Sequence, residues 1–169
     1  LDSDTEVEIT GQASANGTAT LTSDIVDIDN LVSGDTVNLT GNNTLTLASN
    51  VNAGNGNVEV NNAVTLDGDA IVSSAGGNVN FDNTITGAQD LTISAGNTVN
   101  LDGAIGAAGL VDLVVTAGTL IDLDAAITDA ETVTFNGASN IGADITTTNG
   151  AVTLNGATTI SGATRTITA

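Results

Sequence analysis

The sequence predicts an all-β protein that folds as a parallel β-solenoid of about eight coils. Short apolar–polar–apolar segments recur every 19 to 22 residues, Val, Ile and Thr dominate these segments, and Gly, Asn, Ala and Ser separate them. We expect one domain over residues 1–169, with less regular coils at 1–35, regular repeats at 36–163 and a terminal strand at 164–169. An antiparallel β-sandwich is the alternative fold.

The first segment of each repeat opens on an apolar residue. Successive residues of this kind lie 20 to 22 positions apart in the sequence. Because a solenoid returns to the same lateral position after each coil, we expect them to stack as one ladder inside the tube. The ladder comprises Val37, Val58, Val79, Val99, Ile121 and Ile141.

Two further apolar rows complete a coil of three short strands. Their period-2 alternation is typical of strands, and Gly-containing turns such as Ala95-Gly96-Asn97 separate them. The second row is expected to comprise Val51, Ile71, Ile93, Val115, Phe135 and Leu154. The third is expected to comprise Leu45, Leu66, Ile85, Ile105, Ile127 and Ile145.

The sandwich explains less of the pattern than the solenoid. It does not require equivalent residues to recur about every 20 positions, and its core usually holds a large aromatic side chain. This chain has only two aromatic residues, Phe81 and Phe135. A narrow aliphatic tube suits such a composition better.

Composition and charge exclude several classes of function. The chain carries 20 acidic residues and one basic residue, Arg165, for a net charge of -19, which disfavours binding to a nucleic-acid backbone. It has no His, Cys or Lys, so the usual general base, thiol nucleophile and Schiff-base amine are missing and we expect no enzymatic activity. No apolar run approaches the length of a membrane span, so we expect no membrane insertion.

The repeats also resemble a known family. The segments DLTISAGN at 90–97, TVNLDGAI at 98–105 and GAVTLNGA at 150–157 are similar to the degenerate repeats of filamentous haemagglutinin-like exoproteins and other giant bacterial surface adhesins. This resemblance covers roughly residues 36–163. It implies a right-handed parallel β-helix, a location outside the bacterial cell or on its surface, and a role as stalk or adhesin toward a receptor that the repeats do not identify.

Acidic residues form the candidate metal site. Asp82, Asp102 and Asp124 occupy the same place in successive repeats, and Asp24, Asp27 and Asp29 cluster near the N-terminus. Hard oxygen ligands suit calcium, which is the only cofactor we consider. A solvated acidic surface is the favoured interpretation. With Asn61, the first three aspartates are also expected to form a side-chain ladder at a turn.

Threonine pairs suggest a more remote alternative, ice binding by a flat face of the solenoid. We expect the pairs to fall at different phases of the coil and therefore to form no continuous row. The pairs are Thr18/Thr20, Thr44/Thr46, Thr84/Thr86, Thr132/Thr134 and Thr166/Thr168.

Both ends of the sequence still alternate like strands. Glu6 and Glu8 flank an apolar residue near the N-terminus, and Arg165 and Ile167 lie near the C-terminus. Either the chain is an excerpt of a longer repetitive adhesin, flanked by further repeats, or it is a subunit that pairs head to tail with copies of itself.

These observations favour a structural function. We expect a non-enzymatic extracellular protein, either the stalk of a surface adhesin or the subunit of a self-assembling filament. A calcium-binding or ligand-binding adhesin module is the alternative.

Overall fold

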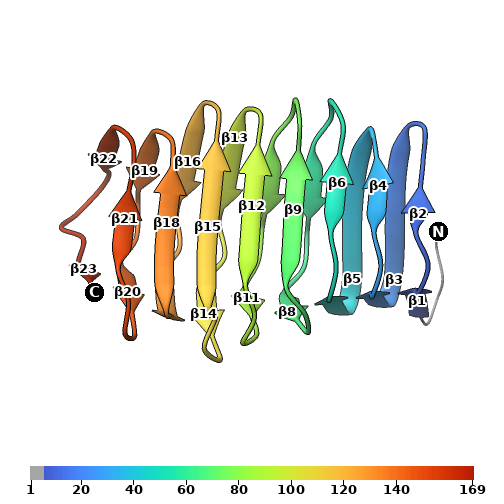
Figure 1. The fold of residues 1–169 in the computed structure, drawn as a ribbon, viewed down its shortest axis with the longest axis horizontal. Helices are drawn as coiled ribbons and strands as arrows, with labels where there is room; N and C mark the ends of the chain where they lie inside the picture. Colours follow the sequence, from blue (N-terminus) through green and yellow to red (C-terminus); the bar gives the residue numbers. More distant parts are fainter. Residues whose placement is uncertain (1–5) are drawn as a thin grey trace.

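The computed structural model describes residues 6–169, and every regular element in this range is a β-strand. The strands wind into a parallel solenoid of about eight coils, which confirms the predicted fold and excludes the antiparallel sandwich. In Figure 1 the near strands run upward while the coils advance from the N-terminus on the right to the C-terminus on the left. This is the sense of a right-handed coil.

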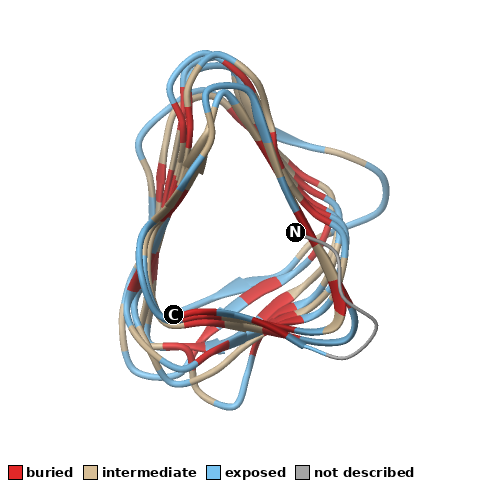
Figure 2. Ribbon diagram, turned by 90° about the vertical axis from the view of Figure 1, so that its right-hand side faces the viewer, coloured by how far each residue is buried: buried red, intermediate tan, exposed pale blue. Residues whose placement is uncertain are grey.

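The coils have a triangular outline with three faces when seen along the axis (Figure 2). Face one contains the first half of β3 (Thr18–Ile28), the first half of β5 (Thr36–Leu47), β7 (Val58–Val60), β10 (Val79–Phe81), β13 (Thr98–Leu101), β16 (Leu120–Leu123), β19 (Ser139–Ile141) and β22 (Thr158–Ile160).

The other two faces follow in the same chain order. Face two contains β1 (Glu6–Ile9), the second halves of β3 and β5, β8 (Val64–Leu66), β11 (Ile85–Thr86), β14 (Ile105–Ala107), β17 (Ile127–Ala130), β20 (Ile145–Thr147) and β23 (Ile167–Thr168). Face three contains β2 (Ala13–Ser14), β4 (Val32–Gly34), β6 (Val51–Ala53), β9 (Ala70–Ser74), β12 (Leu91–Ala95), β15 (Asp112–Ala117), β18 (Thr132–Asn136) and β21 (Val152–Leu154).

The long strands β3 and β5 bend around the corner between faces one and two. Their pairing is interrupted between Ser23 and Ile25, where the register shifts. On β5 this corner holds Gly41, because a side chain there would overlap the backbone carbonyl of Thr44. The bend joins faces one and two into a single sheet, whereas face three forms a second sheet.

The core is a continuous column of apolar side chains inside the tube. In most strands inward residues are buried and alternate with partly exposed outward residues, as in the buried–intermediate–buried pattern of β7 and β10. Phe81 and Phe135 both fit inside, stacked between aliphatic residues of the neighbouring coils. Each fully buried Val, Leu or Ile side chain stabilises the fold by about 1.5–3 kcal/mol.

The first predicted ladder pairs in register for five of its members, from Val37 to Ile121. The sixth position is different, because Ile121 pairs with Ser139 while Ile141 pairs with Leu123. The connection from β16 to β19 is two residues shorter than a 20-residue spacing requires. Ile141 therefore stays inside the tube but moves to the neighbouring row.

The other two rows also need one correction each. Val72, not Ile71, pairs with Val51 and Ile93, and Ile71 points outward with 44% of its surface exposed. A slip of one residue moves a side chain to the opposite side of the sheet. In the third row Val64 pairs with Leu45, whereas Leu66 pairs with Leu47.

Candidate functional site

A ladder of amide and carboxylate side chains runs along the outside of face one. Asn80 Nδ2 donates to Glu59 Oε2 over 2.7 Å, and Asn100 Nδ2 donates to Asn80 Oδ1 over 2.6 Å. Farther along, Asn140 Nδ2 donates to Asp122 Oδ1 over 2.8 Å. These groups lie at the centre of each strand, one coil apart. Hydrogen bonding between coils therefore occupies their polar atoms and stiffens the face.

Sequence reasoning placed this ladder at the following turn instead. There, Asn61 Nδ2 donates to Thr40 Oγ1 over 3.0 Å, but the next positions are aspartates, which cannot donate when ionised. The signal that could have located the true ladder is the polar residue between the two apolar residues of each first segment. That residue is Asn80 in β10 and Asn100 in β13.

The predicted carboxylate column lies at the corner between faces one and two. The backbone amides of Asp82, Asp102 and Asp124 each donate to a carbonyl of the preceding coil, over 3.0–3.1 Å. Burial raises the pKa of the Asp102 carboxyl above its usual value of 3.8, and the neighbouring carboxylates of Asp124, Asp82 and Asp122 raise it further. The structure thus brings these three aspartates into a line of mutually repelling charges.

The second acidic group does not converge on one point. Asp24 lies at the corner between faces one and two, where Asn42 Nδ2 approaches it at 3.5 Å. Asp27 points outward from face two, and Asp29 follows the end of β3 at the next corner. Burial raises the pKa of Asp27, and the charges of Asp29, Asp67 and Glu6 add to the effect.

These acidic groups make a poor match for a calcium site. Among residues 6–169, no three His, Cys, Asp or Glu side chains come together in an arrangement that could hold a metal ion. Calcium takes six to eight oxygen ligands around a common centre. The Asp82, Asp102 and Asp124 carboxylates instead follow one another along the axis, about 4.8 Å apart from coil to coil.

Face two carries a threonine row that sequence reasoning missed. Three of the predicted pairs share this face, and single threonines continue their row, so the expectation of unrelated phases is wrong for them. Each member of the row directly follows the inward residue of its strand: Thr46, Thr65, Thr86, Thr128, Thr146 and Thr168. The row is interrupted at Gly106, where the pairing between β11 and β14 shifts. The remaining pairs lie on faces one and three.

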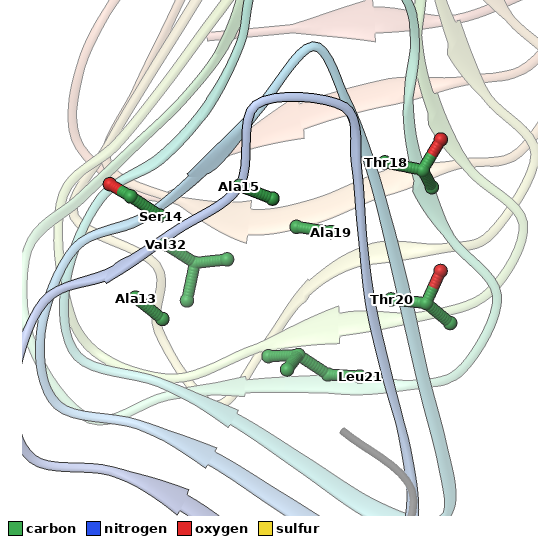
Figure 3. A pocket seen from close by; sticks show the side chains of 8 residues that line it. All are labelled: Ala13, Ser14, Ala15, Thr18, Ala19, Thr20, Leu21 and Val32. Carbon is green, nitrogen blue, oxygen red and sulfur yellow. The ribbon is translucent and has the colours of Figure 1, made fainter.

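The N-terminal end of the tube contains a hollow of about 220 Å³, shown in Figure 3. It lies inside the corner between β2 and β3. Ala13 and Ala19 stand here in rows that continue with Val32 and Val37 in the next coil. The smaller side chains leave space, which is lined by Ala13, Ser14, Ala15, Thr18, Ala19, Thr20, Leu21 and Val32.

The C-terminal end presents larger apolar side chains. Ile160 is 50% exposed and Ile167 is 42% exposed, although both occupy positions that are buried in other coils. The Nε atom of Arg165 is buried without a hydrogen-bond partner within the described chain.

The predicted self-assembly residues are therefore divided between the two ends. Glu6 and Glu8 lie on β1 and pair with Ile25 and Asp27 in the second coil. Arg165 and Ile167 belong to the C-terminal end. The two pairs of residues therefore lie at opposite ends of one molecule (Figure 1).

Comparison with protein-family models, curated proteins and solved structures finds no match for this chain. A search of residues 6–169 for a helix long and apolar enough to cross a membrane finds none.

Proposed function

We propose that the chain is a non-enzymatic structural rod. It acts as the β-helical stalk of a bacterial surface adhesin or as the subunit of an extracellular filament. One observation carries this proposal: parallel pairing continues in all three faces from the first coil to the last. The extracellular location is supported by the likeness of the repeats to those of large surface adhesins.

Continuous stacking suits a spacer because it makes the rod stiff along its length. Each coil contacts only its neighbours, so the number of coils sets the length of the rod. Backbone hydrogen bonds, the buried rows and the Glu59–Asn80–Asn100 ladder all connect adjacent coils along the axis. At about 4.8 Å per coil, eight coils span roughly 40 Å.

The chemistry of the surface also supports a structural role. Ionisable groups are almost all carboxylates, and those in the corner column follow one another instead of facing across a cleft. General acid–base catalysis needs groups that converge on a reacting atom. The net charge of -19 serves a different purpose, since it repels neighbouring rods from lateral contact.

Single-molecule force spectroscopy on the 169-residue chain, held at its two termini, tests the proposal. We expect the folded length to persist at low force and then to increase in repeated steps. Each step should release one coil of about 20 residues, or about 70 Å of extended chain. Smooth extension without such steps would contradict a stalk function, because the coils would then not act as stacked structural units.

Ice binding is a second candidate, and the threonine row of face two favours it. Thr65, Thr128 and Thr146 are exposed, and neighbouring coils repeat their hydroxyl and methyl groups at a spacing of about 4.8 Å. Thermal hysteresis measurements test this function. Activity that Thr65→Lys and Thr128→Lys abolish would support it, and the absence of hysteresis in the unmodified chain would exclude it.

A further inference from the structure

We propose that the loop at residues 107–109 is a cleavage site for a protease that accepts small side chains. The loop lies at the corner between β14 on face two and β15 on face three. This inference rests on the proposed structural function, because it gives the rod one defined position at which it is divided. The partner is identified by the residues that the loop offers to it.

The 107–109 loop belongs to a connection that is two residues longer than its neighbours. Strand pairing aligns Ile85, Ile105 and Ile127 on face two, and it aligns Leu91, Leu113 and Val133 on face three. The two aligned positions are eight residues apart in this coil but six residues apart in the coil before and in the coil after. The extra length extends below the adjacent corners in Figure 1. This corner therefore has slack that the adjacent corners lack.

The backbone of the 107–109 loop is largely free of the neighbouring coils. Outside the strand ladders of residues 6–169, its one backbone hydrogen bond is local, from the Gly109 N–H to the Gly106 carbonyl over 3.1 Å. Ala107 and Ala108 are exposed, and nothing lies within 4 Å of a Cβ atom at Gly109. The next residue, Leu110, is fully buried and fixes the far end of the loop. The accessible segment is therefore short and well defined.

The loop also holds an unfavourable backbone conformation. Ala108 has a φ of +86°, in the left-handed region that residues with a side chain rarely adopt, and Gly109 has a φ of +79°. Extended peptides bind in a protein cleft through main-chain hydrogen bonds, as an added strand does. Extension relieves the conformation of Ala108 and breaks no strand ladder at that residue. It is therefore easier here than inside a strand.

Similar dipeptides elsewhere in the chain are held by hydrogen bonds between coils. Three of them lie at the corner between faces three and one: Ala75-Gly76, Ala95-Gly96 and Ala117-Gly118. In each, the glycine N–H donates to a carbonyl of the preceding coil, over 2.9–3.0 Å. These bonds must break before the dipeptide fits a protease cleft. Hydrogen bonding thus distinguishes the 107–109 loop from dipeptides of the same residue types.

The composition of the chain indicates the class of protease. Enzymes that cleave after basic residues have one target, Arg165, and those that cleave after aromatic residues have only Phe81 and Phe135, which are buried. The loop instead offers two alanines and a glycine within an uncharged stretch, residues 103–111. A small substrate-binding pocket like that of elastase accepts such side chains.

Cleavage after Ala108 hydrolyses the Ala108–Gly109 peptide bond. Water adds a hydroxyl group to the Ala108 carbonyl carbon and a hydrogen to the Gly109 nitrogen, and proton transfer at neutral pH leaves a carboxylate and an ammonium group. Residues 6–108 and 109–169 then stay together through core packing and the pairing of β12 with β15, β13 with β16 and β14 with β17. A continuous rod becomes two stacked parts that separate at this junction under load.

Limited proteolysis of the 169-residue chain with pancreatic elastase tests this inference. Mass spectrometry at early times should show a first cut after Ala107 or Ala108. We expect this cut to be at least about tenfold faster than a cut at any of the three bonded dipeptides, because it does not wait for a coil to open. The two products should elute together on size-exclusion chromatography in buffer and separately in urea.

A double variant identifies the site. Ala107→Asp combined with Ala108→Asp should remove the first cut, because a pocket for small side chains excludes a charged one. Ala88→Asp is the matched control, since Ala88 is exposed at the same corner of the preceding coil but in a connection of ordinary length. This control should leave the first cut unchanged. Circular dichroism verifies that both variants keep their β-sheet content.

Two results would overturn the inference. A first cut at Ala75-Gly76, Ala88 or Ala95-Gly96 would show that corners of ordinary length open as readily as the 107–109 loop. A chain that elastase cleaves in urea but not in buffer would show that the loop is not accessible. Neither result affects the stalk proposal, because the coil-sized steps under force are measured on the uncleaved chain.

Discussion

The backbone conformation of a single residue can determine whether one coil of this solenoid stacks on the next. Gly106 in β14 has a φ of +100°, which side-chain-bearing residues rarely adopt. A Cβ atom there would also overlap the backbone carbonyl oxygen of Thr128 in the next coil. The register shift between β11 and β14 occurs at the same place. Glycine is therefore the residue that allows the longer coil to stack without opening the ladder.

Gly106→Ala should destabilise the fold by roughly 2–4 kcal/mol, because it combines an unfavourable φ with a backbone overlap. Urea unfolding followed by circular dichroism measures the change. Gly11→Ala is the control, since nothing lies within 4 Å of a Cβ atom at that glycine. A similar effect from both substitutions would show that Gly106 has no special backbone role.

The Asp102 carboxyl makes stability depend on pH in a defined direction. Its pKa is raised in the folded state by burial and then by the charges of Asp124, Asp82 and Asp122. Below the usual pKa of 3.8 the Asp102 carboxyl is protonated, and its contribution to the stability of the folded state is fully present. That contribution is lost as the pH rises through the raised pKa of the folded state. At neutral pH the ionised Asp102 is therefore a small destabilising element.

Asp102→Asn should stabilise the protein at pH 7, by less than about 1 kcal/mol, and should have little effect at pH 3. Thermal unfolding at both pH values tests this. Glu131→Gln removes one charge from an exposed site and serves as the control. A stabilisation by Asp102→Asn that is equally large at pH 3 would contradict the electrostatic cause.

At the level of elements, apolar spacing predicted three strands per coil and most of their inward residues. It erred where two apolar residues are adjacent, as in Ile71-Val72, because alternation alone does not tell which one faces the core. It erred again at Ile141, because a turn shortened by two residues keeps the side chain inside but changes its row. Turn lengths are set by local backbone geometry, which a periodic pattern does not contain.

The surface rows were harder to predict than the core. The threonine row of face two escaped detection because two of its members, Thr65 and Thr128, stand alone in the sequence. The face-one ladder was placed two residues too late, at the aspartates of the corner. In both cases the missing information was which residues of successive coils pair, and the structure supplies it.

Asn80→Ala should reduce the free energy of unfolding by about 1–2 kcal/mol, because it removes hydrogen bonds to two neighbouring coils. Chemical denaturation measures the loss. Thr92→Ala is the comparison, as Thr92 is a partly buried outward residue on face three. If both substitutions cost the same, the ladder contributes no more than ordinary surface packing.

At the scale of the whole molecule, stacking and charge act in different directions. Buried rows and backbone pairing bind each coil to the next along the axis. Nineteen net negative charges repel other copies from the sides of the rod. A stiff axial element that resists lateral aggregation follows from both.

The most direct test of the central claim is a distance measurement by pulsed electron paramagnetic resonance between spin labels at Ser33 and Asn136. The chain has no cysteine, so Ser33→Cys and Asn136→Cys provide unique attachment sites. These residues belong to one outward row of face three and lie five coil steps apart. A rigid solenoid predicts one narrow distance distribution centred near 24 Å, unchanged between low and high salt. A broad or salt-dependent distribution would contradict the account, since the coils would then not form a continuous rigid rod.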